Sequence, residues 1–124
     1  MHDYWDKQPV SREGTTPGEI DTERDVSKKT TKLPDSFVWS SCGIKEACEF
    51  LREYYVENGR FKLCYTKDVL KWSINDSIAI RKKDTNQLVG YITSMPVNSR
   101  IENEDIKMTQ IDYLCVHPSY RTFG

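Results

Sequence analysis

The sequence lacks the features that mark membrane-spanning, zinc-binding and nucleic-acid-binding proteins. Its 124 residues contain no apolar run that approaches the roughly 20 residues of a transmembrane helix. Histidine occurs only twice and the four cysteines never form a C-x-x-C pair, so their spacing does not indicate a metal site. Eighteen basic and nineteen acidic residues give a net charge of -1 without a block of like charge, which argues against nucleic acid as a partner.

Signal-peptide features are also missing, because the residues from Met1 to Asp6 form neither a basic nor an apolar region. We therefore expect a cytoplasmic protein whose cysteines are reduced and mostly buried. What the sequence does contain is 37% hydrophobic and 30% charged residues, a balance that predicts a globular core in one modest domain.

The composition divides the chain into an N-terminal arm, residues 1–32, and a domain, residues 33–124. Within the arm, residues 11–32 are almost entirely polar and cannot bury enough surface to order themselves, so they read as a flexible linker. The first ten residues differ, because they include Tyr4 and Trp5. An aromatic cluster of this kind predicts that they dock onto another surface.

Two helices are expected in the first half of the domain. Ser41 can begin the first and Gly59 can end it, and the apolar positions between them recur at helical spacing: Ile44, Ala47, Cys48, Leu51 and Tyr55. Thr66 can cap a short second helix that runs through Trp72.

Extended structure is expected in the second half. Residues 77–81 and 87–95 flank a polar segment and predict a hairpin with its turn near residues 84–86. A short extended run follows at residues 99–102, and residues 107–116 alternate before they become apolar. The order of helix, helix and antiparallel meander predicts an α/β fold of the α+β type.

The last predicted strand ends at Pro118 and continues into an Arg-x-x-Gly turn from Arg121 to Gly124. This segment resembles the L-x-V-x-P-x-Y-R-x-x-G motif of GNAT acyltransferases. In that fold the strand splays from its neighbour, so that the pantetheine arm of an acyl-CoA adds like an extra strand and the next helix start receives the pyrophosphate. By itself the pattern also fits an ordinary strand and surface turn.

Seven segments, taken in order, resemble motifs of the N-myristoyltransferase family. They are His2 to Val10 (F-W-x-x-Q-P-V), Leu33 to Trp39 (L-P-x-G-F-x-W), Tyr54 to Glu57 (N-Y-V-E), Phe61 to Tyr65 (F-R-F-x-Y), Leu70 to Trp72 (L-x-W), Leu88 to Ile92 (L-V-G-F-I) and Ile111 to His117 (I-N-F-L-C-V-H). The resemblance spans nearly the whole chain and is to the N-terminal part of the family's sequence.

The resemblance implies a partial GNAT-like domain that acts in the transfer of a myristoyl group from myristoyl-CoA, a co-substrate, to the N-terminal glycine of proteins or peptides. It implies a monomer without a metal. The family is built from two GNAT-like halves, and its second half supplies most of the peptide site and a C-terminal carboxylate as base. This chain is therefore expected to be an incomplete fragment, inactive alone. Two alternatives stay open: another GNAT acyl- or acetyltransferase, and a non-catalytic truncated binding fragment.

The resemblance also assigns site residues. The backbone amides of Tyr113 and Leu114 would form the oxyanion hole for the thioester carbonyl. Residues expected to contact the acyl-CoA are His2, Asp3, Tyr4, Trp5, Tyr113, Leu114, Cys115, Val116, Arg121, Thr122 and Gly124. Residues expected to contact the peptide are Val56, Glu57, Phe61, Leu63 and Tyr65.

Each assignment has a purely structural alternative. Tyr113 and Leu114 also fit plain strand positions, and Glu57 also fits a solvated helix end. Tyr4 and Trp5, which we expect to pack against the sheet near Leu114, also fit simple hydrophobic anchors. Cys115 is not expected to be a nucleophile, because it lies in an apolar strand where a thiol is usually inert.

Overall fold

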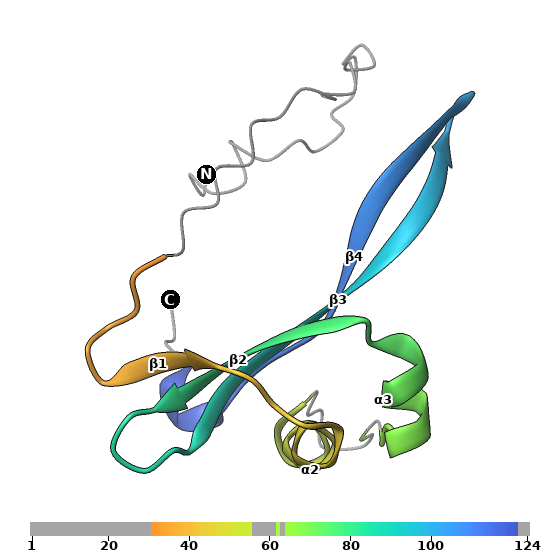
Figure 1. The fold of residues 1–124 in the computed structure, drawn as a ribbon. Coiled ribbons are helices and arrows are strands. Elements are labelled where there is room, and N and C mark those ends of the chain that lie inside the picture. Colours follow the sequence, from red (N-terminus) through yellow and green to blue (C-terminus); the bar gives the residue numbers. More distant parts are fainter. Residues whose placement is uncertain (1–30, 56–61, 63, 122–124) are drawn as a thin grey trace, which may run out of the picture. The chain divides into compact units, whose positions relative to one another are not determined.

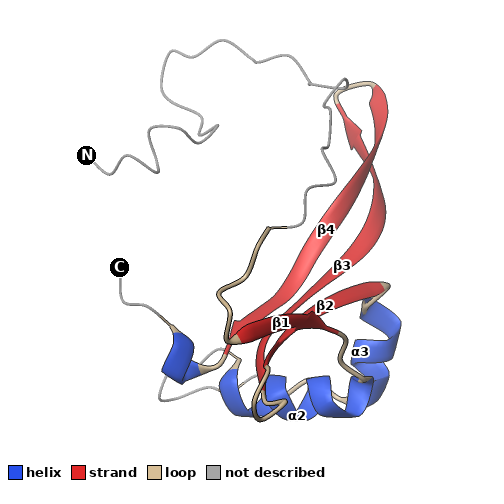
Figure 2. Ribbon diagram, turned by 60° about the vertical axis from the view of Figure 1, so that its left-hand side comes forward, coloured by secondary structure: helices blue, strands red, loops and turns tan. Residues whose placement is uncertain are grey.

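A computed structural model describes residues 31–55, 62 and 64–121 of the chain. Its four strands form one antiparallel sheet in the order β1-β2-β3-β4. Two helices lie against the same face of that sheet (Figures 1 and 2). The elements in chain order are β1 (Phe37–Ser40), α2 (Ile44–Tyr54), α3 (Lys67–Ser73), β2 (Asp76–Lys82), β3 (Leu88–Ile101), β4 (Glu104–Val116) and the 3-10 helix η1 (Pro118–Tyr120).

Both predicted helices are present. The first differs at its ends: Gly43 rather than a serine occupies the N-cap position, and the helix ends at Tyr54, so Tyr55 lies beyond it in extended conformation. Gly59 lies outside the described residues. The cap of α3 agrees with the sequence pattern, because the side chain of Thr66 accepts a hydrogen bond from the Val69 amide at 3.3 Å.

The predicted hairpin is confirmed in β2 and β3. Its turn includes Asn86, which has φ 58 and whose amide donates to the Lys82 carbonyl at 2.9 Å. The prediction of a separate short run at residues 99–102 was wrong, because β3 continues without a break to Ile101. It stays extended because its second half pairs with β4 along a long two-stranded ribbon that projects beyond the other strands (Figure 1).

Strand β1 was missing from the predicted meander. Its four residues are too few to show a periodic pattern, and two of them, Val38 and Trp39, are 41% and 42% exposed. Pairing with β2 defines the strand: Trp39 lies opposite Ile80 and Ser40 lies opposite Ala79. The strand exists because of a neighbour some 40 residues away, which local sequence does not specify.

The core lies between the helices and one face of the sheet. The two helices contribute Ala47, Cys48, Phe50, Leu51 and Leu70, and the strands contribute Ala79, Leu88, Tyr91, Tyr113 and Cys115. All four cysteines are free thiols. Only two of them are buried, since Cys42 is half-buried and Cys64 is exposed. In the described ranges, no helix has the length and apolar character that crossing a membrane requires.

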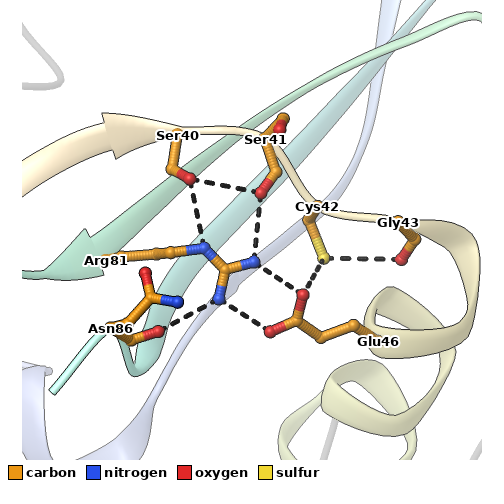
Figure 3. A network of polar contacts seen from close by, with 7 residues as sticks. All are labelled: Ser40, Ser41, Cys42, Gly43, Glu46, Arg81 and Asn86. Carbon is orange, nitrogen blue, oxygen red and sulfur yellow. Dashed lines mark hydrogen bonds and ion pairs between the residues drawn. The ribbon is translucent and has the colours of Figure 1, made fainter.

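Arg81 of β2 is a buried charged side chain that joins three parts of the fold (Figure 3). Its Nη1 and Nη2 atoms donate to the two carboxylate oxygens of Glu46 in α2, at 2.7 and 2.6 Å. Further hydrogen bonds, each 3.1 Å long, reach Ser40 Oγ and the carbonyl oxygens of Ser41 and Asn86. Five hydrogen bonds use the full donor capacity of the guanidinium, which offsets the cost of burying its charge.

The ion pair changes the acidity of its neighbours. The hydrogen bond from Arg81 lowers the pKa of Glu46, and the same bond raises the pKa of Arg81. Beside them, Cys42 Sγ donates to Glu46 Oε2 at 3.7 Å. Burial, and then the negative charge of Glu46, raise the pKa of the Cys42 thiol to about 12, so it remains a protonated donor.

Candidate functional site

The outer strand of the sheet carries a β-bulge near its C-terminal end. Tyr91 of β3 pairs with Cys115 of β4, and Thr93 pairs with Asp112. One residue of β3 therefore faces two residues of β4, Tyr113 and Leu114. A bulge disrupts the ladder locally and leaves the extra residue unpaired.

The backbone at the bulge is strained. Tyr113 has φ 50, in the left-handed region that bulky residues rarely adopt. Such a conformation costs of order 1–3 kcal/mol and persists only where the surroundings enforce it. Conformations of this kind cluster at sites that bind ligands, which makes the bulge a candidate functional site.

The Tyr113 side chain is anchored in the core under the bulge. Its ring is 8% exposed and packs edge-on against Tyr65, with 5.0 Å between ring centroids, and against Tyr55 at 6.0 Å. Its hydroxyl is hydrogen-bonded to Ser73 Oγ at 2.9 Å. The side chain thus points into the protein while the next residue points out, since Leu114 is 64% exposed.

This arrangement can hold an anionic oxygen without any charged side chain. β4 is the last strand in the sheet order of the described residues, so one of its edges is not paired with another strand there. Amide groups that a bulge turns away from the ladder can donate to negative charge that develops on a bound carbonyl oxygen. An extended ligand can also add along such an edge.

Cys115 resumes the ladder directly after the bulge. It is 3% exposed, and burial raises the pKa of its thiol. A thiol that stays protonated is a poor nucleophile, in agreement with the sequence argument. Cys115 contributes packing, and its backbone returns β4 to pairing with Tyr91.

The chain after β4 is fastened to the end of α2. The Arg121 guanidinium donates from Nη2 to the Tyr54 carbonyl at 2.7 Å and from Nε to the Val116 carbonyl at 2.8 Å. A cation at a helix C-terminus satisfies an unpaired carbonyl and complements the helix dipole. The His117 ring packs on the Tyr54 ring, with 4.5 Å between centroids. That Arg121 also reaches phosphate groups stays a prediction.

The structure brings together some of the predicted site residues. Tyr113, Leu114, Cys115 and Val116 are consecutive at the bulge, and Arg121 bonds to the last of them. Tyr65, expected in the peptide site, lies against the Tyr113 ring. The other predicted residues lie outside the described part of the chain: His2, Asp3, Tyr4, Trp5, Val56, Glu57, Phe61, Leu63, Thr122 and Gly124.

Two residues that the sequence argument did not select also contact the bulge. Ser73 ends α3 and Tyr55 follows α2, and both touch the Tyr113 side chain. A serine at a helix end carries no functional signal, so nothing in the sequence marked Ser73. The expected docking of Tyr4 and Trp5 near Leu114 concerns residues outside the described ranges.

Comparison with known proteins identifies relatives of this fold and site. Residues 18–123 match the family model described as Myristoyl-CoA:protein N-myristoyltransferase, N-terminal domain. The glycylpeptide N-tetradecanoyltransferase of Dictyostelium discoideum is 33% identical over 140 residues, which cover 97% of this chain and 34% of the relative. The Saccharomyces cerevisiae enzyme is 30% identical over 142 residues, covering 98% and 31%.

A solved structure agrees with the sequence relatives. The crystal structure of Saccharomyces cerevisiae N-myristoyltransferase with bound myristoyl-CoA matches with a TM-score of 0.78 and 30% identity, over 98% of this chain and 34% of that one. The prediction of an α+β, GNAT-like fold is thereby confirmed. The chain spans about a third of the length of these relatives. It belongs to the N-myristoyltransferase family, and it corresponds to the family's N-terminal domain.

Proposed function

We propose that the β4 bulge binds the thioester of myristoyl-CoA, with the Tyr113 and Leu114 amides as donors to its carbonyl oxygen. The observation that carries this proposal is the two-against-one pairing at these two residues, together with φ 50 at Tyr113. Fixed amide dipoles at a developing oxyanion are each worth about 3 kcal/mol of transition-state stabilisation. They require no catalytic side chain, which suits a site whose one buried thiol has a raised pKa.

The co-substrate and reaction follow from the family. The related Saccharomyces cerevisiae enzyme binds myristoyl-CoA, and we propose the same ligand here, with transfer of the myristoyl group to the N-terminal glycine of a protein. The acyl-CoA residues would be those of the bulge with Cys115, Val116 and Arg121, and Tyr65 would border the peptide. The protein would act as a cytoplasmic monomer, a location supported by the absence of a long apolar run in its sequence.

An NMR titration of the chain with a non-hydrolysable myristoyl-CoA analogue tests the site. We expect weak binding, with the largest amide shifts at Tyr113 and Leu114 and smaller ones along β4. CoA without an acyl group is the matched control, and it should leave these two amides nearly unshifted because it lacks the acyl carbonyl that they are proposed to bind. Amides of β1, on the opposite edge of the sheet, serve as the internal reference.

The same titration separates the competing functions. Preferential binding of acetyl-CoA would favour a different GNAT acyltransferase. If the shifted amides lay outside β4, or if no acyl-CoA shifted any amide at the highest concentration used, the bulge would not be the thioester site. Activity is tested with a chimera in which this chain replaces the N-terminal third of the Dictyostelium discoideum relative. We expect the chimera to transfer a myristoyl group to a peptide with an N-terminal glycine.

A further inference from the structure

The bulge needs an anchor, because Tyr113 would not adopt φ 50 without external support. The anchor has to act through the side chain, since the ladder itself is interrupted at this residue. The Tyr113 ring contacts two other aromatic rings, those of Tyr65 and Tyr55. Edge-to-face ring packing limits the position of the ring but is tolerant of small rotations.

The third contact is directional. The Tyr113 hydroxyl lies 2.9 Å from Ser73 Oγ, which sets the distance of the phenol from α3. Ser73 is the last residue of α3, and contacts along that helix hold it in position. Thr66 caps the start of that helix, Leu70 is fully buried in it, and the Ile74 amide donates to the Leu70 carbonyl at its end.

We infer that Ser73 is a positioning residue, which holds the Tyr113 ring through its hydroxyl and thereby fixes the backbone of the β4 bulge. The inference rests on the proposed function for the role of the bulge, but the effect of the Ser73–Tyr113 hydrogen bond on the bulge backbone can be measured without any ligand. It connects the end of α3 to the two amides proposed to receive the thioester oxygen. Ser73 touches neither these amides nor the substrate in this scheme, and acts through Tyr113 alone.

A second tyrosine in the same core provides the comparison. Tyr91 of β3 is 2% exposed, and its buried hydroxyl lies near Ser77 but makes no hydrogen bond within the described part of the chain. Burial in this core therefore does not by itself give a phenol a partner. The Ser73 contact is a specific pairing across 40 residues of sequence.

The test uses conservative variants of the 124-residue chain. Ser73→Ala and Tyr113→Phe each remove one hydroxyl of the pair, and the double variant completes a cycle. Ser73→Thr keeps a hydroxyl and serves as the rescue. Tyr91→Phe is the matched control, because it removes a buried phenol hydroxyl that makes no hydrogen bond to any described residue. All are followed by relaxation dispersion of the backbone amides, which detects μs–ms motion.

We expect Ser73→Ala, Tyr113→Phe and the double variant to show the same new exchange broadening at residues 113–115. In Ser73→Ala, which keeps the tyrosine, the Tyr113 Cα and Cβ shifts should also move away from their wild-type values. Ser73→Thr and Tyr91→Phe should keep the wild-type pattern. The effects should not add, because either substitution breaks the same contact. Affinity for the myristoyl-CoA analogue should fall about two- to tenfold in the first three variants, the range that one neutral hydrogen bond is worth.

The two proposals fail in different ways. If the bulge broadens in the variants but no protein, wild type included, binds the analogue, the positioning role stands and the proposed function is wrong. If the wild type binds and Ser73→Ala and Tyr113→Phe show unchanged bulge amides and equal affinity, the positioning role is overturned and the proposed function survives. Broadening spread evenly over β2, β3 and β4 would also overturn it, because that pattern indicates general destabilisation.

Discussion

Two buried tyrosines show that the effect of a phenol hydroxyl on stability depends on its hydrogen-bond partners. Tyr91 and Tyr113 both stand where the resembled family motifs carry phenylalanine, and both side chains are buried in the same core. The Tyr113 hydroxyl has a partner in Ser73, whereas the Tyr91 hydroxyl has none among the residues that the structure describes. Burial raises the pKa of Tyr91, the sign expected when a phenol has lost its water, and the nearby Ser77 side chain opposes this rise. The same chemical group is therefore expected to stabilise the fold at one position and to cost stability at the other.

Tyr91→Phe is expected to raise the free energy of unfolding by about 1 kcal/mol, because it removes a buried polar atom that has no partner. Tyr113→Phe should lower the free energy of unfolding by a similar amount, because it leaves Ser73 without its partner. Urea unfolding with an unchanged m-value measures both. A lower midpoint for Tyr91→Phe would show that its hydroxyl has a partner in solution.

At the level of elements, one side chain determines how β1, α2 and β2 meet. Arg81 reaches the end of β1, the first turn of α2 and the β2–β3 turn, so three connections share one guanidinium. The Arg81 side chain is only 10% exposed, whereas the side chain of Glu46, whose carboxylate balances its charge, is 45% exposed. Because one partner is buried and the other is half exposed, the pair is expected to contribute more than a surface ion pair and less than a fully buried one.

Glu46→Gln is expected to destabilise the chain by about 1–2 kcal/mol at neutral pH, after allowance for the exposure of the carboxylate. The pKa of Glu46 is lowered in the folded state by the Arg81 hydrogen bond. Its stabilisation is therefore complete above the ordinary glutamate pKa and is lost as the pH falls through the lowered folded value. Urea unfolding between pH 7 and pH 3 should show the wild type and the variant converging at the acidic end.

Glu49→Gln on the same helix is the control for this prediction, since Glu49 is also an acidic residue of α2 but is exposed. It should change the unfolding free energy by less than about 0.5 kcal/mol, as surface substitutions usually do. A constant difference between the wild type and Glu46→Gln at every pH would contradict the ion-pair explanation.

For the molecule as a whole, the two faces of the sheet differ. One face packs on α2 and α3 and holds the core. On the other face, apolar side chains are open to solvent: Trp39, Ile78, Ile111 and Leu114 are between 42% and 64% exposed. Ile78 pairs with Ile92, next to the buried pair of Ala79 and Tyr91, so the alternation of the strands places these side chains on opposite sides. Among the described residues, the buried core cluster therefore lies on one side of the sheet, whereas the other side carries half-buried and exposed apolar side chains.

We expect the 124-residue chain alone to release no measurable CoA thiol from myristoyl-CoA in the presence of a glycine peptide. It spans about a third of its relatives, and the resemblance assigns the base and most of the peptide site to a second half. Loss of a general base alone typically costs about 10² to 10⁴ in rate, and loss of substrate positioning costs more. A thiol-release assay with the Dictyostelium discoideum relative as positive control measures this. Robust turnover by the chain would place the base within these residues.

The features that could be predicted from the sequence alone are those that depend on near neighbours. The apolar spacing that places Ala47, Cys48 and Leu51 on one face predicted α2, and Thr66 predicted the start of α3, because periodicity and capping act within one or two turns. The motifs predicted the family, and the roles that they assign to Tyr113 and Leu114 stay predictions. The contacts between Glu46 and Arg81 and between Ser73 and Tyr113 span 35 and 40 residues, so they could be recognised only in the folded chain. The tertiary structure also decided the bulge, because strand register depends on the partner strand and a shift of one residue exchanges the two faces.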